Sequence, residues 1–214
     1  MKEYIRVNQA CYDNLAEEYA ERADNKSSSE ESESNLCKFI LNTVTLPDDA
    51  LVLEIGPGAG KILQCFSNLG FYTIGVELSA KMASLAHKTS PQSPIIIGDV
   101  LEMDFVEGQF DIIYLGALIH LFPQEDAMLL MRKVSRWLKP TGRVFVNTTC
   151  NDETQEGFYE KKDYHAQRKR FRRRWTESCF NDFVIASGFL VLDTMYTDEH
   201  DRGKRWVAYV CKKA

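Results

Sequence analysis

The chain has 214 residues, 44% of them hydrophobic, which is enough to bury the core of one medium-sized domain. Its net charge of −5 gives no sign of a uniformly basic surface, and its six cysteines include no CxxC pair that would indicate a zinc site or a disulfide framework. No apolar run approaches the roughly 20 residues of a membrane span, and the N-terminus is too polar for a signal peptide. We therefore expect a reduced, cytoplasmic protein with no bound metal and no membrane contact.

Two helices are predicted ahead of the first strand. Residues 7–22 place four side chains on one helical face, namely Tyr12, Leu15, Ala16 and Tyr19. A second helix carries Leu36, Phe39, Ile40 and Val44 on one face and ends before Pro47. Between them, residues 24–35 are rich in serine and acidic residues. We expect an exposed, mobile connection there, because such a segment buries too little apolar surface to order itself.

The segment at 51–61, LVLEIGPGAGK, contains an apolar run, an acidic residue and three alternating glycines, and helical spacing follows it at 61–69. A buried strand that leads into a glycine-rich turn and a helix is typical of the first unit of an open α/β sheet. The dinucleotide-binding fingerprint requires glycines at its first, third and sixth positions, and the sixth position here is Lys61. The spacing therefore argues against a dinucleotide.

Strands and helices alternate along the rest of the chain. The predicted strands cover 71–77, 94–99, 110–115, 143–147, 189–196 and 205–211. The predicted helices begin at Ser79, Pro123 and Thr176, and residues 138–143 are predicted to form a turn. This alternation predicts five parallel strands followed by a terminal strand pair.

The spacing of Glu54, Gly56, Gly58 and Gly60 resembles the ExGxGxG motif of class I S-adenosylmethionine-dependent methyltransferases. The later strands follow in that family's order. The resemblance implies an α/β fold: a Rossmann-like seven-stranded sheet with helices on both faces and a C-terminal antiparallel strand pair. It also implies a helical lid at 1–46, a methyltransferase domain at 47–214, and S-adenosylmethionine as the cofactor.

The same resemblance implies the residues that bind the cofactor. In that family the glycine turn wraps the amino-acid end, an acid after the second strand accepts the ribose hydroxyls, and an acid after the third strand contacts the adenine amine. The residues implied in this sequence are Tyr19, Glu54, Gly56, Pro57, Gly58, Gly60, Glu77, Leu78, Asp99, Val100, Leu115 and Gly116.

The string YDNLAEEY at 12–19 resembles the YDxxAxxY element that precedes many small-molecule methyltransferase domains, where the helix lies over the cofactor and the substrate as a lid. An amphipathic helix packed on the sheet explains the apolar face equally well. Both interpretations stay open.

The acceptor is expected at the carboxyl ends of the strands, where ligands lie in open α/β sheets. The candidate acceptor-binding residues are Tyr12, His120, Asn147, Tyr164, Arg172 and Arg174. His120 directly follows the fourth strand and is the best-placed catalytic base, ahead of His165 and His200. A base is needed only if the acceptor arrives protonated, and the family often has a histidine at this position that is not a base.

Residues 151–175 form an insertion whose charge departs from that of the rest of the chain. From 161 to 174 it holds eight basic residues and one acidic residue, interleaved with aromatic residues. This composition fits contact with an anionic group of the acceptor, a solvated surface, or contact with nucleic acid.

We predict transfer of a methyl group from S-adenosylmethionine to oxygen or nitrogen of a small organic acceptor that is anionic or aromatic. The alternatives are an RNA methyltransferase that uses the segment 161–174, and a non-catalytic cofactor-binding module that regulates a partner. The fourth strand ends in YLGA at 114–117 rather than in Asn/Asp-Pro-Pro-Tyr/Phe, which disfavours methylation of nucleic-acid bases. A small molecule is therefore the expected partner.

Overall fold

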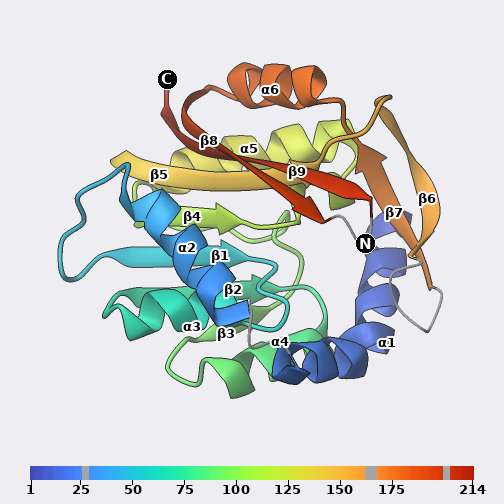
Figure 1. The fold of residues 1–214 in the computed structure, drawn as a ribbon, viewed down its shortest axis with the longest axis horizontal. Coiled ribbons are helices and arrows are strands. Elements are labelled where there is room, and N and C mark those ends of the chain that lie inside the picture. Colours follow the sequence, from blue (N-terminus) through green and yellow to red (C-terminus); the bar gives the residue numbers. More distant parts are fainter. Residues whose placement is uncertain (26–28, 162–167, 200–202) are drawn as a thin grey trace.

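Helices and strands alternate along residues 1–25, 29–161, 168–199 and 203–214, which this computed structural model describes (Figure 1). The elements are α1 (Glu3–Asn25), α2 (Ser29–Leu41), β1 (Leu51–Ile55), α3 (Lys61–Asn68), β2 (Tyr72–Glu77), α4 (Ala80–Thr89), β3 (Ile95–Ile97), β4 (Phe110–Leu115), the 3-10 helix η1 (Ile119–Leu121), α5 (Gln124–Trp137), β5 (Leu138–Thr149), β6 (Gln155–Lys161), β7 (Arg168–Arg174), α6 (Glu177–Ala186), β8 (Phe189–Glu199) and β9 (Lys204–Lys213). In this described part of the chain, no helix is long and apolar enough to cross a membrane.

Seven of the strands form one sheet in the order β3-β2-β1-β4-β5-β9-β8. The first five strands are parallel, whereas β9 pairs antiparallel with both β5 and β8. This arrangement confirms the predicted seven-stranded sheet with its C-terminal antiparallel pair.

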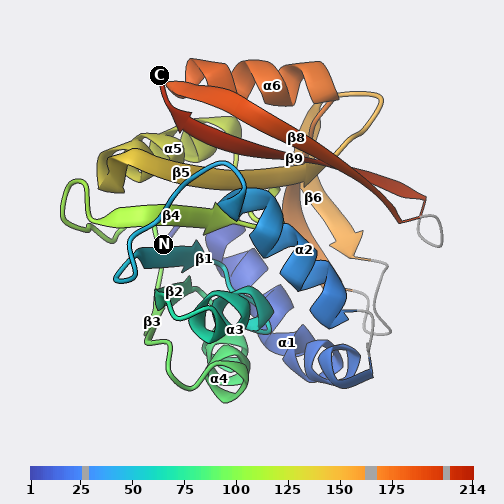
Figure 2. The ribbon, with the colours of Figure 1, turned by 60° about the vertical axis from the view of Figure 1, so that its left-hand side comes forward.

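The sheet is covered on both faces, with α2 and α3 on one side and α5 and α6 on the other (Figures 1 and 2). The buried strand β4 shows how the sequence achieves this. Ile112 and Tyr114 pack into the core beneath α2 and α3, whereas Ile113 and Leu115 pack into the core beneath α5 and α6. Because side chains alternate across a strand, a continuous apolar run is what a strand with two covered faces requires.

The N-terminal helices are longer than predicted. Helix α1 continues through Asn25 and α2 begins at Ser29, so residues 24–25 and 29–35 of the predicted connection are helical, while 26–28 lie outside the described residues. The prediction considered the composition of the segment alone. A helix nucleus that is held by packing can propagate into polar residues at little cost, and buried Cys37 and Ile40 provide that packing for α2.

Residues 138–143 also differ from the prediction, because they belong to β5 rather than to a separate turn. The pairing of β4 with β5 shifts register between Phe110 and Ile112, so the extra residues form an irregularity inside the strand. Gly142 fits there because an added Cβ would lie 2.8 Å from the Asp111 carbonyl oxygen.

The basic insertion forms the antiparallel hairpin β6–β7, which lies beside α1 at the end of the sheet toward which β4 points (Figure 1). Strand β7 pairs with β6 from Arg168↔Lys161 to Arg174↔Gln155. The segment of strongest positive charge is therefore a strand, and its side chains alternate between two faces.

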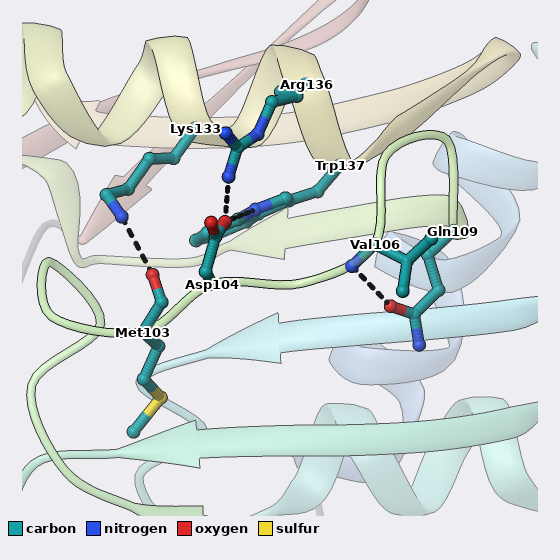
Figure 3. A network of polar contacts seen from close by, with 7 residues as sticks. All are labelled: Met103, Asp104, Val106, Gln109, Lys133, Arg136 and Trp137. Atoms are coloured by element: carbon teal, nitrogen blue, oxygen red, sulfur yellow. Dashed lines mark hydrogen bonds and ion pairs between the residues drawn. The ribbon is translucent and has the colours of Figure 1, made fainter.

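A polar network fixes the segment that leads from β3 to β4 (Figure 3). Trp137 Nε1 donates to Asp104 Oδ1 at 3.0 Å, Arg136 pairs with the same carboxylate, and Lys133 Nζ donates to the Met103 carbonyl at 2.7 Å. All three donors come from α5. The loop after β3 is thus held against a helix of the core.

Candidate functional site

A cavity of about 800 Å³ lies at the carboxyl ends of β1, β2 and β4. Its walls also include α1, the loops after β3 and β4, β7 and the β8–β9 hairpin. The volume is in the range of sites that bury a small molecule or cofactor. Elements from both ends of the chain thus enclose one site at the edge of the sheet where open α/β folds bind ligands.

The glycine turn forms the floor of the cavity. Gly56, Gly58 and Gly60 have φ values of 73°, 55° and 78°, a region in which residues with a Cβ are strained. Gly56, Pro57 and Gly58 line the cavity. Gly60 does not line it: an added Cβ would lie 2.8 Å from the backbone of Ala86, so this glycine permits the contact between the turn and α4.

Glu77 ends β2 with its carboxylate held by two backbone donors. The Gly58 N–H donates to Oε2 at 3.3 Å and the Ser79 N–H donates to Oε1 at 2.9 Å. Burial raises the pKa of this carboxyl, and the nearby Asp13 charge acts in the same direction. The carboxylate is therefore fixed at the cavity edge, next to the glycine turn.

Glu54 lies deeper, near the end of β1, and is 4% exposed. Its Oε2 has no hydrogen-bond partner in the described part of the chain. Burial raises its pKa to about 8, and the charge of Glu77 adds to the effect. An under-satisfied buried carboxyl of this kind is suited to a cationic partner.

Asp99 and Val100 line the cavity directly after β3. Asp99 Oδ1 accepts from the Leu101 N–H at 3.0 Å, which orients the carboxylate at the start of the loop. Leu78 and Gly116 line the cavity from the ends of β2 and β4. The expected cofactor residue Leu115 does not, because the alternation of β4 turns its side chain into the core beneath α5 and α6.

The loop after β4 carries Ala117, a residue with a positive φ of 53°. Its N–H donates to Asn147 Oδ1 at 2.5 Å, so the end of β5 holds this strained turn in place. His120 follows on η1, is 2% exposed and lines the cavity. Its ring centroid lies 6.1 Å from that of Trp206 on β9.

Helix α1 is bonded to several other elements along its first half. Asn8 Nδ2 donates to the Leu121 carbonyl at 3.1 Å, and Asn8 Oδ1 accepts from the Phe171 N–H at 2.8 Å. Ser79 Oγ donates to Asp13 Oδ1 at 2.5 Å. Further bonds join Tyr4 to Asp126 and Gln9 to Leu78. The first half of α1 is thus a fixed wall, from which Tyr12 lines the cavity; Tyr19 lines it from farther along the helix.

Strand β7 supplies two arginines to the cavity, Arg170 and Arg172. Arg170 is 7% exposed and its Nη1 donates to the Tyr12 hydroxyl at 3.0 Å. Arg172 Nη2 donates to Thr149 Oγ1 at 2.6 Å. Arg174 does not line the cavity, since its guanidinium lies 4.4 Å from the centroid of the Tyr159 ring. The arginines that face the cavity are held by hydrogen bonds to α1 and β5.

Three of the expected residues lie in segments that the structure does not describe, and some of the residues that line the cavity were not expected. Tyr164, His165 and His200 lie outside the described residues. The sequence distinguishes Arg170 only as part of the basic segment. It could have been singled out from the two-residue spacing to Arg172, had 168–174 been predicted as a strand. The β8–β9 hairpin also lines the cavity, and no local sequence motif predicts this.

Comparison with known proteins relates these features to a protein family. Residues 53–146 match the family described as "Methyltransferase domain". The fold matches the Burkholderia thailandensis 1,6-didemethyltoxoflavin-N1-methyltransferase, solved with 1,6-didemethyltoxoflavin and S-adenosylhomocysteine, with a TM-score of 0.76 at 20% identity over 99% of this chain and 89% of that one. Residues 53–146 thus form a methyltransferase domain, and the chain has the fold of S-adenosylmethionine-dependent methyltransferases. S-adenosylmethionine is the cofactor of this family.

Two further proteins are similar to this chain, one in structure and one in sequence. The CcbJ methyltransferase of Streptomyces caelestis has a TM-score of 0.71 at 15% identity and covers 94% of this chain and 96% of its own. The phosphoethanolamine N-methyltransferase of Plasmodium falciparum is 33% identical over 137 residues, which are 62% of this chain and 51% of that protein. The chain thus spans about half the length of that curated relative.

Proposed function

We propose that this chain transfers a methyl group from S-adenosylmethionine to a nitrogen or oxygen of a small organic acceptor that carries an anionic group. One observation carries the proposal. Glu77 and the glycine turn on one side, and Arg170 and Arg172 on the other, line the same cavity. A guanidinium binds carboxylate or phosphate well because its planar fork donates two hydrogen bonds.

The residues on the cofactor side suit S-adenosylmethionine. An added Cβ at Gly58 would meet only Met82, at 3.7 Å, so the backbone of the turn is open to close approach from the cavity. We assign Glu77 to the ribose hydroxyls, Glu54 to the ammonium group of the amino-acid end, and Asp99 to the adenine amine. Bound S-adenosylmethionine supplies a methyl group activated by its sulfonium.

On the acceptor side the chain aligns the nucleophile and excludes water. Held by Glu54, Glu77 and Asp99, the cofactor would give its methyl group to the acceptor lone pair and would leave as S-adenosylhomocysteine, with the electron pair of the broken bond on sulfur. An amine or hydroxyl acceptor must also lose a proton. We assign that proton to His120, because this residue lines the cavity at the end of β4 and is almost fully buried.

The relative from Plasmodium falciparum, named as a phosphoethanolamine N-methyltransferase, supports an acceptor that joins a phosphate to an amine. Arg170 and Arg172 are suited to such a phosphate. Tyr12 adds a hydroxyl to the same wall, where it accepts from Arg170. We therefore place the anionic end of the acceptor against β7, and the reacting end toward His120.

A role in RNA methylation is less well supported. Of the basic residues on β7, two face the cavity, and others are engaged beside acidic residues of the hairpin. Arg173 Nη1 donates to Glu156 Oε2 at 2.6 Å, and Glu160 is the cross-strand partner of Lys169. Such pairing lowers the field that an RNA backbone would meet. The non-catalytic alternative leaves the cavity-facing arginines unexplained.

The test is a methyl-transfer assay with radiolabelled S-adenosylmethionine. The acceptors are phosphoethanolamine, ethanolamine as its matched analogue without phosphate, small carboxylic acids, phenols and a short RNA. We expect labelling of an oxyanion-bearing small acceptor and none of ethanolamine. Labelling of RNA alone would replace the proposal with the RNA alternative. Cofactor binding without labelling of any acceptor would support the regulatory module.

A further inference from the structure

The β8–β9 hairpin builds one wall of the cavity from three cross-strand pairs. The pairs are Met195↔Ala208, Thr197↔Trp206 and Glu199↔Lys204, and all six residues line the cavity. Residues directly opposite each other on an antiparallel pair point to the same face of the sheet. Along the hairpin, the wall therefore changes from an apolar pair through a threonine–tryptophan pair to a charged pair.

Trp206 offers its ring rather than its N–H to this cavity. Its side chain is partly exposed, whereas its Nε1 is buried and has no hydrogen-bond partner within the described residues. The accessible part of the residue is therefore indole carbon. The other two tryptophans, Trp137 and Trp175, are 0% and 1% exposed and do not line the cavity.

Trp206 is near both of the groups assigned to the acceptor. Its centroid is 6.1 Å from that of His120. Trp206 is also the cross-strand partner of Thr149, whose Oγ1 accepts from Arg172. Cross-strand partners have Cβ atoms about 5 Å apart. The ring, the proposed base and an anion-binding arginine are therefore neighbours on the wall of the cavity.

We infer that Trp206 determines the specificity of the acceptor site by holding a cationic nitrogen on its π face. This inference rests on the proposed function and narrows it to nitrogen: the acceptor is a short zwitterion whose amine lies a few bonds from a phosphate or carboxylate. Tryptophan is the strongest aromatic partner for an ammonium group, and it retains this attraction when the nitrogen becomes methylated. His120 takes the proton that an ammonium must lose before nitrogen can attack.

The inference is tested by calorimetry on the protein saturated with S-adenosylhomocysteine. The two probes are phosphoethanolamine and propyl phosphate, which has a methyl group in place of the ammonium. Replacing Trp206 with Leu should raise the Kd of phosphoethanolamine about threefold to thirtyfold, the range of a cation–π contact. It should leave the Kd of propyl phosphate nearly unchanged. Trp206→Phe should give a smaller loss in the same direction.

Tyr196→Leu is the matched control, because Tyr196 lies on the same hairpin, is 46% exposed and does not line the cavity. Equal losses for both probes in Trp206→Leu, or no loss for either, would overturn the inference and leave the methyltransferase proposal standing. Wild-type protein that binds S-adenosylhomocysteine but not phosphoethanolamine would also overturn it. Failure of folded wild-type protein to bind S-adenosylhomocysteine would instead remove the proposed function. If Trp206→Leu does not bind S-adenosylhomocysteine, Trp206→Phe decides the result.

Discussion

The two sides of the cavity are built in different ways. The cofactor side comes from consecutive units of the sheet: the turn after β1, Glu77 at the end of β2 and Asp99 after β3. The acceptor side is gathered from α1, β7 and the β8–β9 hairpin, which are far apart in the sequence. Short local motifs can describe the first side, whereas only the folded chain brings the second together. The residues that the family motif predicts are thus encoded locally, whereas the residues that we propose for the acceptor are not.

The largest effect is expected from a substitution that destabilises the fold on the cofactor side of the cavity. Gly60→Ala should lower the free energy of unfolding by about 2–4 kcal/mol, because the new Cβ meets the Ala86 backbone at 2.8 Å and the backbone keeps a positive φ. Denaturant titration measures this. Gly70→Ala is the control: its φ is 93° but nothing lies within 4 Å, so about 1 kcal/mol is expected. Equal losses of stability in the two variants would contradict a packing role for Gly60.

A change to Glu77 should affect the cofactor side alone. Glu77→Gln should weaken S-adenosylhomocysteine binding by about 1.5–3 kcal/mol, the size of a hydrogen bond to a charged group. Calorimetry measures this, with Glu107→Gln as an exposed control. Unchanged affinity in Glu77→Gln would exclude the assignment to the ribose.

Arg172 and Arg174 lie on the same strand, but only Arg172 lines the cavity. Substituting each in turn therefore distinguishes a contact with the acceptor from an effect of surface charge. Arg172→Ala should raise the acceptor KM about tenfold, because a charge-assisted contact is lost, and should leave cofactor affinity unchanged. Arg174→Ala should change neither quantity, since Arg174 lies over Tyr159 outside the cavity. Steady-state kinetics with the acceptor found in the labelling assay gives both values. Equal effects of the two substitutions would mean that β7 acts only through its net charge.

The stability of the fold should also depend on pH through the cofactor side. Burial raises the pKa of Glu54 from its ordinary value of 4.5 to about 8, so the folded ligand-free protein keeps a proton that the unfolded chain loses. Stability from this group should be fully present below pH 4.5 and should be lost as the pH rises toward 8. Thermal unfolding across this window measures the loss. Glu54→Gln should flatten the dependence, and an unchanged slope would show that other groups cause it.

The sequence predicts those features of the fold and the site whose signal lies within a few neighbouring residues. The strand with its alternating glycines and the acid at Glu77 were recognisable because each feature lies within a few residues of its partners. The roles of Gly60 and Leu115 were not, since the first depends on the approach of Ala86 and the second on which face of β4 is toward the cavity. Arg170 and Trp206 reach the site only through strand pairing and sheet order, which local patterns do not specify.

The most direct test of the account is calorimetric titration of the purified protein with S-adenosylmethionine, S-adenosylhomocysteine and NAD. We predict micromolar binding of both sulfur compounds and no binding of NAD, because the glycines follow the methyltransferase spacing and Lys61 occupies the sixth position of the dinucleotide pattern. A folded sample that binds neither sulfur compound would contradict it. The cavity would then hold something other than a methyl donor, and the roles assigned to both of its sides would be lost.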